Sequence, residues 1–116
     1  MILENISEHS LVVNKRLLLN YDVTFPHEVL FKIIGPDNKP LEFIPIVKAG
    51  LPKIEDFIPL LPKEFIIKIY QLDRYFSFSK KGKYTIQATY ENYYQPSSMK
   101  VWTGSIKSNI VKIKVK

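Results

Sequence analysis

The stretch from Lys83 to Tyr90 constrains the fold most, because it carries the clearest alternation of apolar and polar residues in the chain. Its apolar positions are Tyr84, Ile86, Ala88 and Tyr90, and its polar positions are Thr85, Gln87 and Thr89. A period of two is that of a strand with one buried face. Phe and Tyr occur seven times each, and aromatic residues favour strands over helices. The sequence therefore predicts an all-β chain.

The turn that opens this strand reads Gly82-Lys83-Tyr84-Thr85-Ile86. A tyrosine at a strand start, two residues before a buried position, is the sequence form of a tyrosine corner, a feature of immunoglobulin-like sandwiches. The pattern predicts that the Tyr84 hydroxyl bonds to upstream backbone and that Gly82 adopts a positive φ. Gly82, Tyr84 and Ile86 are thus the candidate structural residues. We expect one domain over residues 1–116, an immunoglobulin-like Greek-key β-sandwich of about seven strands.

Shorter alternations predict three further strands and one hairpin partner. Glu28 to Ile34 is a strand with Val29, Phe31 and Ile33 on one face. Leu41 to Ile44 is expected to pair back on it after the turn at Gly35 to Pro40. Glu64 to Leu72 is expected to point Phe65, Ile67 and Ile69 inward. Asn109 to Lys116 is expected to point Val111, Ile113 and Val115 inward, and Lys112, Lys114 and Lys116 outward. Such a lysine row protects a terminal strand from edge-to-edge pairing.

The segment from Pro45 to Lys63 holds four prolines, which exclude a central strand or a long helix. It also holds many large apolar residues, among them Phe57. A loop of this composition covers an apolar surface, either the edge of the sandwich or a partner.

The charge and the cysteine content limit the kinds of partner and of metal site that the sequence allows. The net charge is +6, but the lysines are spread along the chain and only Arg16 and Arg74 are arginines. Specific nucleic-acid sites cluster charge and use arginine, so solvated strand faces explain the charge better than nucleic acid does. The absence of cysteine excludes disulfides and thiolate metal sites. No apolar run reaches the roughly 20 residues that span a bilayer.

Catalytic constellations are not found in the sequence. His9 and His27 lack the spacing of zinc ligands, and no serine elbow or glycine-rich phosphate loop is present. The adjacent carboxylates Glu55 and Asp56 do not have glycosidase geometry. We therefore expect a protein that is not an enzyme and has no metal or cofactor.

The stretch with recognition character is the loop from residue 91 to residue 102. Tyr93, Tyr94 and Trp102 are rigid aromatics that could stack on a sugar or anchor a protein, with Phe57 as a further anchor. The alternative is that Trp102 and Tyr90 complete the core.

Several motifs, taken in order, resemble a known family. They are Asn5-Ile6-Ser7, Leu30 to Ile33 before Gly35 to Lys39, Ala49 to Pro52, Asp56-Phe57, Leu61 to Glu64, Leu72, Tyr75-Phe76, Gly82 to Ile86, Trp102 to Gly104, and Ser108-Asn109. The pattern is similar to the bacterial immunoglobulin-like domain found at the N-terminus of deuterolysin-type metallopeptidases. The zinc motif of that peptidase has no counterpart here. Against the family pattern, one or two opening strands are expected to be absent before Ile2. The resemblance implies an accessory role and an exported location.

These observations lead to a functional expectation. The chain is predicted to be a non-catalytic accessory or protein-binding module. The alternatives are a peptidase inhibitor and a carbohydrate-binding module, each acting through loops 45–63 and 91–102.

Overall fold

The computed structural model describes residues 1–19, 28–44 and 50–116, and in these ranges the chain is all-β, as predicted. The elements are β1 (Ile2–Glu4), β2 (Leu11–Asn14), β3 (Val29–Ile34), η1 (Ile54–Asp56), β4 (Phe57–Leu60), β5 (Phe65–Ile67), η2 (Leu72–Arg74), β6 (Gly82–Asn92), β7 (Gly104–Lys107) and β8 (Val111–Val115). The two η elements are single turns of 3-10 helix.

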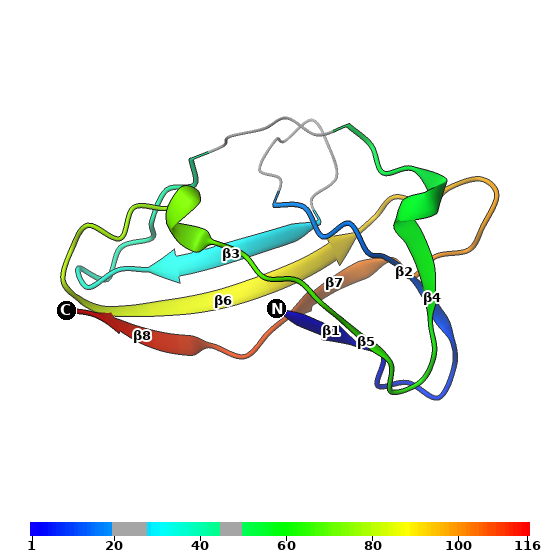
Figure 1. Ribbon diagram of the computed structural model, residues 1–116, viewed down its shortest axis with the longest axis horizontal. Coiled ribbons are helices and arrows are strands. Elements are labelled where there is room, and N and C mark those ends of the chain that lie inside the picture. The colour runs from blue at the N-terminus through cyan, green and yellow to red at the C-terminus, as the bar shows by residue number, and fades with distance from the viewer. Residues whose placement is uncertain (20–27, 45–49) are drawn as a thin grey trace.

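Strand β6 is the centre of the largest sheet. One edge of β6 pairs antiparallel with β3, and the other edge pairs with β7 and β8, which lie end to end along it (Figure 1). Thr89 stands opposite Lys107 whereas Ile86 stands opposite Val111. The partner strand therefore holds one extra residue between these points, which is the register change of a β-bulge.

Two small antiparallel pairs, β1–β5 and β2–β4, pack against one face of this sheet. The Trp102 N–H donates to the Val12 carbonyl at 2.8 Å and ties β2 to the strand return before β7. The shared core contains side chains from both layers. Its buried members are Leu3, Val13, Leu17, Val29, Phe31, Ile33, Leu60, Phe76, Tyr84, Ala88 and Tyr90.

The predicted turn at Gly82 and Tyr84 is confirmed. The Tyr84 hydroxyl donates to the Lys80 carbonyl at 2.6 Å, and the Tyr84 side chain is 1% exposed. Gly82 has a φ of +134°, and a Cβ there would lie 2.8 Å from the Cβ of Pro36. Only glycine fits this position without strain. Ile86 packs against the core from the same strand face.

The strand predicted from Glu64 to Leu72 is shorter than expected, and its faces are reversed. Only Phe65–Ile67 forms a strand, and the side chains of Phe65, Ile67 and Ile69 are exposed. Ile66 faces the core instead, because it stands opposite the buried Leu3. The sequence here is apolar at consecutive positions, so alternation could not identify the inner face.

The proline-rich segment contains a strand that its composition did not predict. β4 includes Pro59 and pairs with β2. The Lys15 N–H donates to the Asp56 carbonyl, and antiparallel pairs alternate between bonded and non-bonded. Pro59, opposite Val12, is therefore in a non-bonded pair and its nitrogen points away from β2. Residues 45–49 of this segment, like His27, lie outside the described residues.

Two other expectations need correction. Leu41 to Ile44 forms no strand, although the Leu41 N–H still donates to the Ile33 carbonyl. In β8, Val111 and Ile113 face the same side as Ile86 and Tyr84, as predicted, but they are 47% and 37% exposed. The predicted direction of these side chains is confirmed, but they are not buried because the second layer does not extend over them.

Candidate functional site

The predicted aromatic residues are divided between the interior and the surface. Phe57 is buried, and its ring stacks on Tyr94 with 6.1 Å between ring centroids. Trp102 stacks on the buried Tyr90 at 5.7 Å. Tyr93 is 61% exposed and is the member of the set that presents an open ring. Of the four predicted residues, Phe57 and Tyr94 stack on each other, Trp102 stacks on Tyr90, and Tyr93 alone has a largely exposed ring, so they do not form a flat aromatic platform.

Asn92 holds the loop that carries these aromatics. Its side chain is buried, and its amide nitrogen Nδ2 donates to the carbonyls of Tyr94 at 3.1 Å and Trp102 at 2.9 Å. A buried amide with two backbone partners fixes both ends of a loop. Tyr93 therefore projects from a braced turn.

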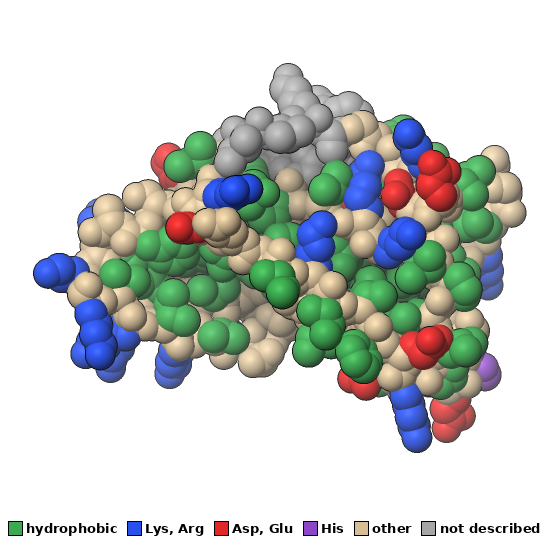
Figure 2. Space-filling model, viewed as in Figure 1, with side chains coloured by type: hydrophobic (Ala, Val, Ile, Leu, Met, Phe, Trp, Pro, Cys, Tyr) green, Lys and Arg blue, Asp and Glu red, His purple; other side chains and the backbone are tan. Residues whose placement is uncertain are grey.

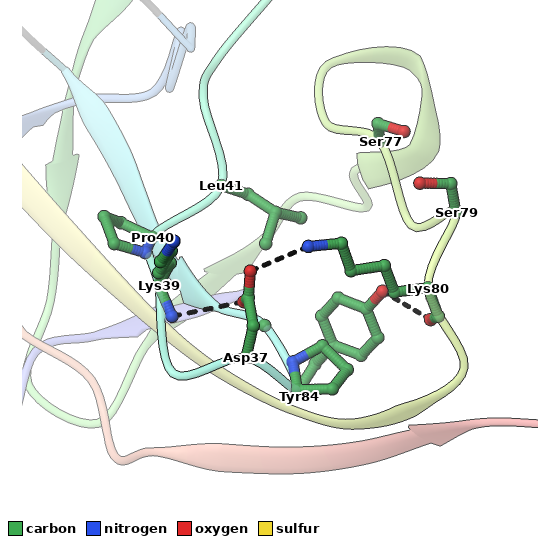
Figure 3. Close-up of a pocket in the computed structure, with 10 residues that line it drawn as sticks. Asp37, Lys39, Pro40, Leu41, Ser77, Ser79, Lys80 and Tyr84 are labelled. Atoms are coloured by element: carbon green, nitrogen blue, oxygen red, sulfur yellow. Dashed lines mark hydrogen bonds and ion pairs between the residues drawn. The ribbon is translucent and has the colours of Figure 1, made fainter.

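A small polar pocket of about 170 Å³ lies beside the Tyr84 turn (Figure 3). The Lys80 ammonium forms an ion pair with Asp37 at 2.8 Å, and this hydrogen bond lowers the pKa of Asp37 and raises the pKa of Lys80. The Asp37 carboxylate also accepts from the Lys39 N–H. The facing charges neutralise each other here, so the pocket is best explained as part of the turn.

The partly exposed Arg16 and the buried Glu28 form an ion pair that the sequence did not reveal. The Glu28 carboxylate accepts from the Arg16 guanidinium and from the Leu18 N–H. The guanidinium also donates to the Gly50 carbonyl at 3.0 Å. The charges of Arg16 and Glu28 compensate each other, and their hydrogen bonds join residues 16–18 to Glu28 and Gly50. The pair is therefore structural.

An apolar groove of about 290 Å³ opens between the layers, where β1 and β2 face β6 and β7. Its walls include Leu3, Val13 and Tyr90 from the core, and Ile106 of β7 at its mouth. Ile106 stands directly opposite Tyr90, yet it is 46% exposed against 3% for Tyr90. A second groove, between β1 and β7, shares Ile106 and reaches Ser108. The inner face of the sheet is therefore open along β7.

The outer face of the β1–β5 pair is an apolar surface that the sequence did not predict. Ile2 stands opposite Ile67, and Phe65 stands opposite Glu4. The exposed apolar side chains of this face, which we call the ribbon face, are Ile2, Phe65 and Ile67. Ile6 and Ile69, which lie just beyond the two strands, are also exposed. Figure 2 shows hydrophobic side chains gathered over β1 and β5. The signal in the sequence was the run Phe65-Ile66-Ile67, which is apolar on both faces of a strand.

Within residues 1–19, 28–44 and 50–116, no three histidine, aspartate or glutamate side chains are grouped so that they could hold a metal ion. No helix in those ranges is long and apolar enough to cross a bilayer.

Comparisons with models of protein families, with curated proteins and with solved structures give no match for this chain.

Proposed function

We propose that this chain is a non-catalytic protein-binding module with an immunoglobulin-like fold. Two features support the fold. The Tyr84 hydroxyl bonds to backbone four residues upstream, and two small antiparallel pairs pack on one face of an antiparallel sheet.

The proposed binding surface is the ribbon face. Phe65 is 55% exposed and Ile67 is 59% exposed, and they lie on β5, whose other face packs on the core through Ile66. A strand with two apolar faces is typical of a sheet covered on both sides. Contiguous exposed apolar side chains on this scale mark interaction sites in soluble proteins.

The experiment is a comparison of two lysine variants in a pull-down from the source organism. Ile67→Lys places a charge in the centre of the ribbon face. Ile54→Lys is the matched control, because Ile54 is also about half exposed but lies on η1. Tyr93→Ala tests the aromatic loop in parallel. Circular dichroism establishes that all three variants fold.

The expected result is one near-stoichiometric protein that the wild type and Ile54→Lys retain and that Ile67→Lys loses. Loss in Tyr93→Ala alone would move the site to the aromatic loop. Equal retention by Ile67→Lys and Ile54→Lys would overturn the ribbon face as the site. If the captured protein is a peptidase, inhibition of its activity by the chain would favour the inhibitor alternative.

A further inference from the structure

Strands β7 and β8 form a sheet edge whose backbone is free. In the described part of the chain, no strand pairs with their far side. The Ser108 N–H donates to the Ala88 carbonyl at 2.8 Å, and bonded pairs alternate along an antiparallel ladder. The peptide groups of Ser105 and Lys107 therefore point outward. An edge of this kind is a template for another strand.

The inner face of this edge is apolar and open. Ile106, Val111 and Ile113 stand opposite Tyr90, Ile86 and Tyr84 and face the same side of the sheet. Each of the three remains more than a third exposed, because the second layer stops short of them. The outermost row of the inner face is thus uncovered from Ile106 to Ile113, whereas Val115 at its end packs against the core.

The outer face of the same edge is basic. Lys83 stands directly opposite Lys114, and Lys112 lies two residues along β8 on the same face. Like charges directly opposite each other destabilise a sheet. Within the described residues none of these lysines forms an ion pair. Figure 2 shows basic side chains projecting around the end of the molecule that holds β8.

We propose that the β7–β8 edge accepts an extended segment of a partner protein in which apolar and acidic residues alternate. The apolar side chains would lie beside Val111 and Ile113, the acidic side chains would face Lys112 and Lys114, and the backbone would extend the ladder. Only a strand meets all three requirements, because its side chains alternate between faces with the same period as β8.

A second copy of the chain is a poorer occupant. If β8 of another copy paired antiparallel with β8, residues opposite each other would share a face. The lysines of one copy would then stand among the lysines of the other, which is unfavourable. The lysine row selects against self-pairing and for an acidic segment. This inference does not depend on the ribbon face.

The test uses the full chain and a fluorescent seven-residue peptide of alternating glutamate and valine. Fluorescence anisotropy measures Kd, and amide NMR shifts locate the contact. Peptide N-methylated at the ladder amides tests backbone pairing, and a lysine-valine peptide tests charge. The double variant Lys112→Glu with Lys114→Glu reverses the sign of the charge on this edge. Lys32→Glu with Lys100→Glu is the control, because it changes the net charge equally at exposed sites away from this edge.

We expect binding that is at least about tenfold weaker for the N-methylated peptide and for the reversed edge, since each removes two or more favourable contacts. The lysine-valine peptide should bind the reversed edge better than the wild type. Amide shifts should concentrate on β7 and β8.

Equal weakening by Lys32→Glu with Lys100→Glu, or undiminished binding of the N-methylated peptide, would overturn the proposal and reduce the site to a general anion surface. Binding to phosphatidylserine vesicles at the same residues, with none to the peptide, would assign the edge to a membrane instead. Loss of the pull-down partner in Ile67→Lys leaves this result unaffected, so the two proposals fail separately.

Discussion

Tyr84 and Ile113 stand directly opposite each other on β6 and β8 and point to the same side of the sheet, yet Tyr84 is almost fully buried and Ile113 is not. Tyr90 and Ile106 repeat the contrast on β6 and β7. Tyr84 packs on Phe78, and Tyr90 packs on Trp102 and accepts a hydrogen bond from the Asn14 N–H of β2, whereas the two isoleucines lie one strand further out. Alternation along a strand sets where a side chain points, whereas the neighbouring layer decides whether the side chain is buried.

The largest expected difference between the two regions comes from truncating this opposed pair. Tyr84→Ala should lower the free energy of unfolding by about 3–5 kcal/mol, because it removes a fully buried ring. Ile113→Ala should cost less than about 1 kcal/mol, because its site is open to solvent. Urea denaturation of both variants measures the contrast. Similar losses in the two variants would mean that the edge is covered in solution.

Two glycines with positive φ give the next comparison. Gly82→Ala in the closed turn should cost about 2–3 kcal/mol, since it adds a contact with Pro36 to the backbone strain. Gly104→Ala at the start of β7 should cost about 1–2 kcal/mol, because its Cβ would meet only the Trp102 side chain, at 3.2 Å. Thermal unfolding of both variants ranks them. A larger loss of stability in Gly104→Ala than in Gly82→Ala would contradict the conclusion that the sheet is open along β7.

Alkaline pH should lower the free energy of unfolding through the buried Tyr90, which lies on the covered part of the sheet. Burial raises the pKa of Tyr90 to about 12, against an unfolded value near 10. Tyr90 therefore contributes no loss of stability below pH 10 and a loss of roughly 1.4 kcal/mol for each pH unit between 10 and about 12, because only the unfolded state ionises it there. Burial also raises the pKa of Tyr70, which adds to this slope. Urea midpoints measured from pH 9 to pH 12 give the slope. Tyr90→Phe should lower the stability at neutral pH and flatten the alkaline slope.

The smallest effect is expected at the ion pair beside the corner. Asp37→Asn removes the partner of Lys80, but both side chains reach solvent, and exposed pairs contribute little and are screened by salt. The melting temperature should stay within experimental error at low and at high salt. A clear loss would show that the Tyr84 turn depends on this charge pair and not on packing.

The success of the sequence-based predictions followed how unambiguous the local pattern was. Lys83 to Tyr90 alternates cleanly, so the inner face of β6 and the hydroxyl bond of Tyr84 could both be predicted. Phe65 to Ile67 is apolar at every position, so its inner face was fixed only by pairing with Leu3, which is distant in sequence. β4 was missed because the effect of Pro59 depends on which edge of the strand faces β2.

The candidate sites were less predictable than the fold, because each one depends on exposure. Tyr93 and Phe57 are both aromatic residues in segments expected to be loops, and only the packing places one outside and the other in the core. The lysine row on β8 was expected from the sequence. Its position beside an uncovered apolar row, and opposite Lys83, could not be, because both are consequences of tertiary register.

The order in which the strands pair along the chain also affects how fast the protein folds. Ile2 pairs with Ile67, Leu11 with Leu60 and Phe31 with Ala88, so both small pairs and the β3–β6 ladder close long loops. Loop closure of this kind must precede the contacts that reward it, and such topologies fold in milliseconds to seconds. The β6–β7 ladder is the shortest-range pairing and should form early. A folding chain would then expose this edge before the longer-range pairs have closed, and the lysines of β8 would repel other copies during that interval.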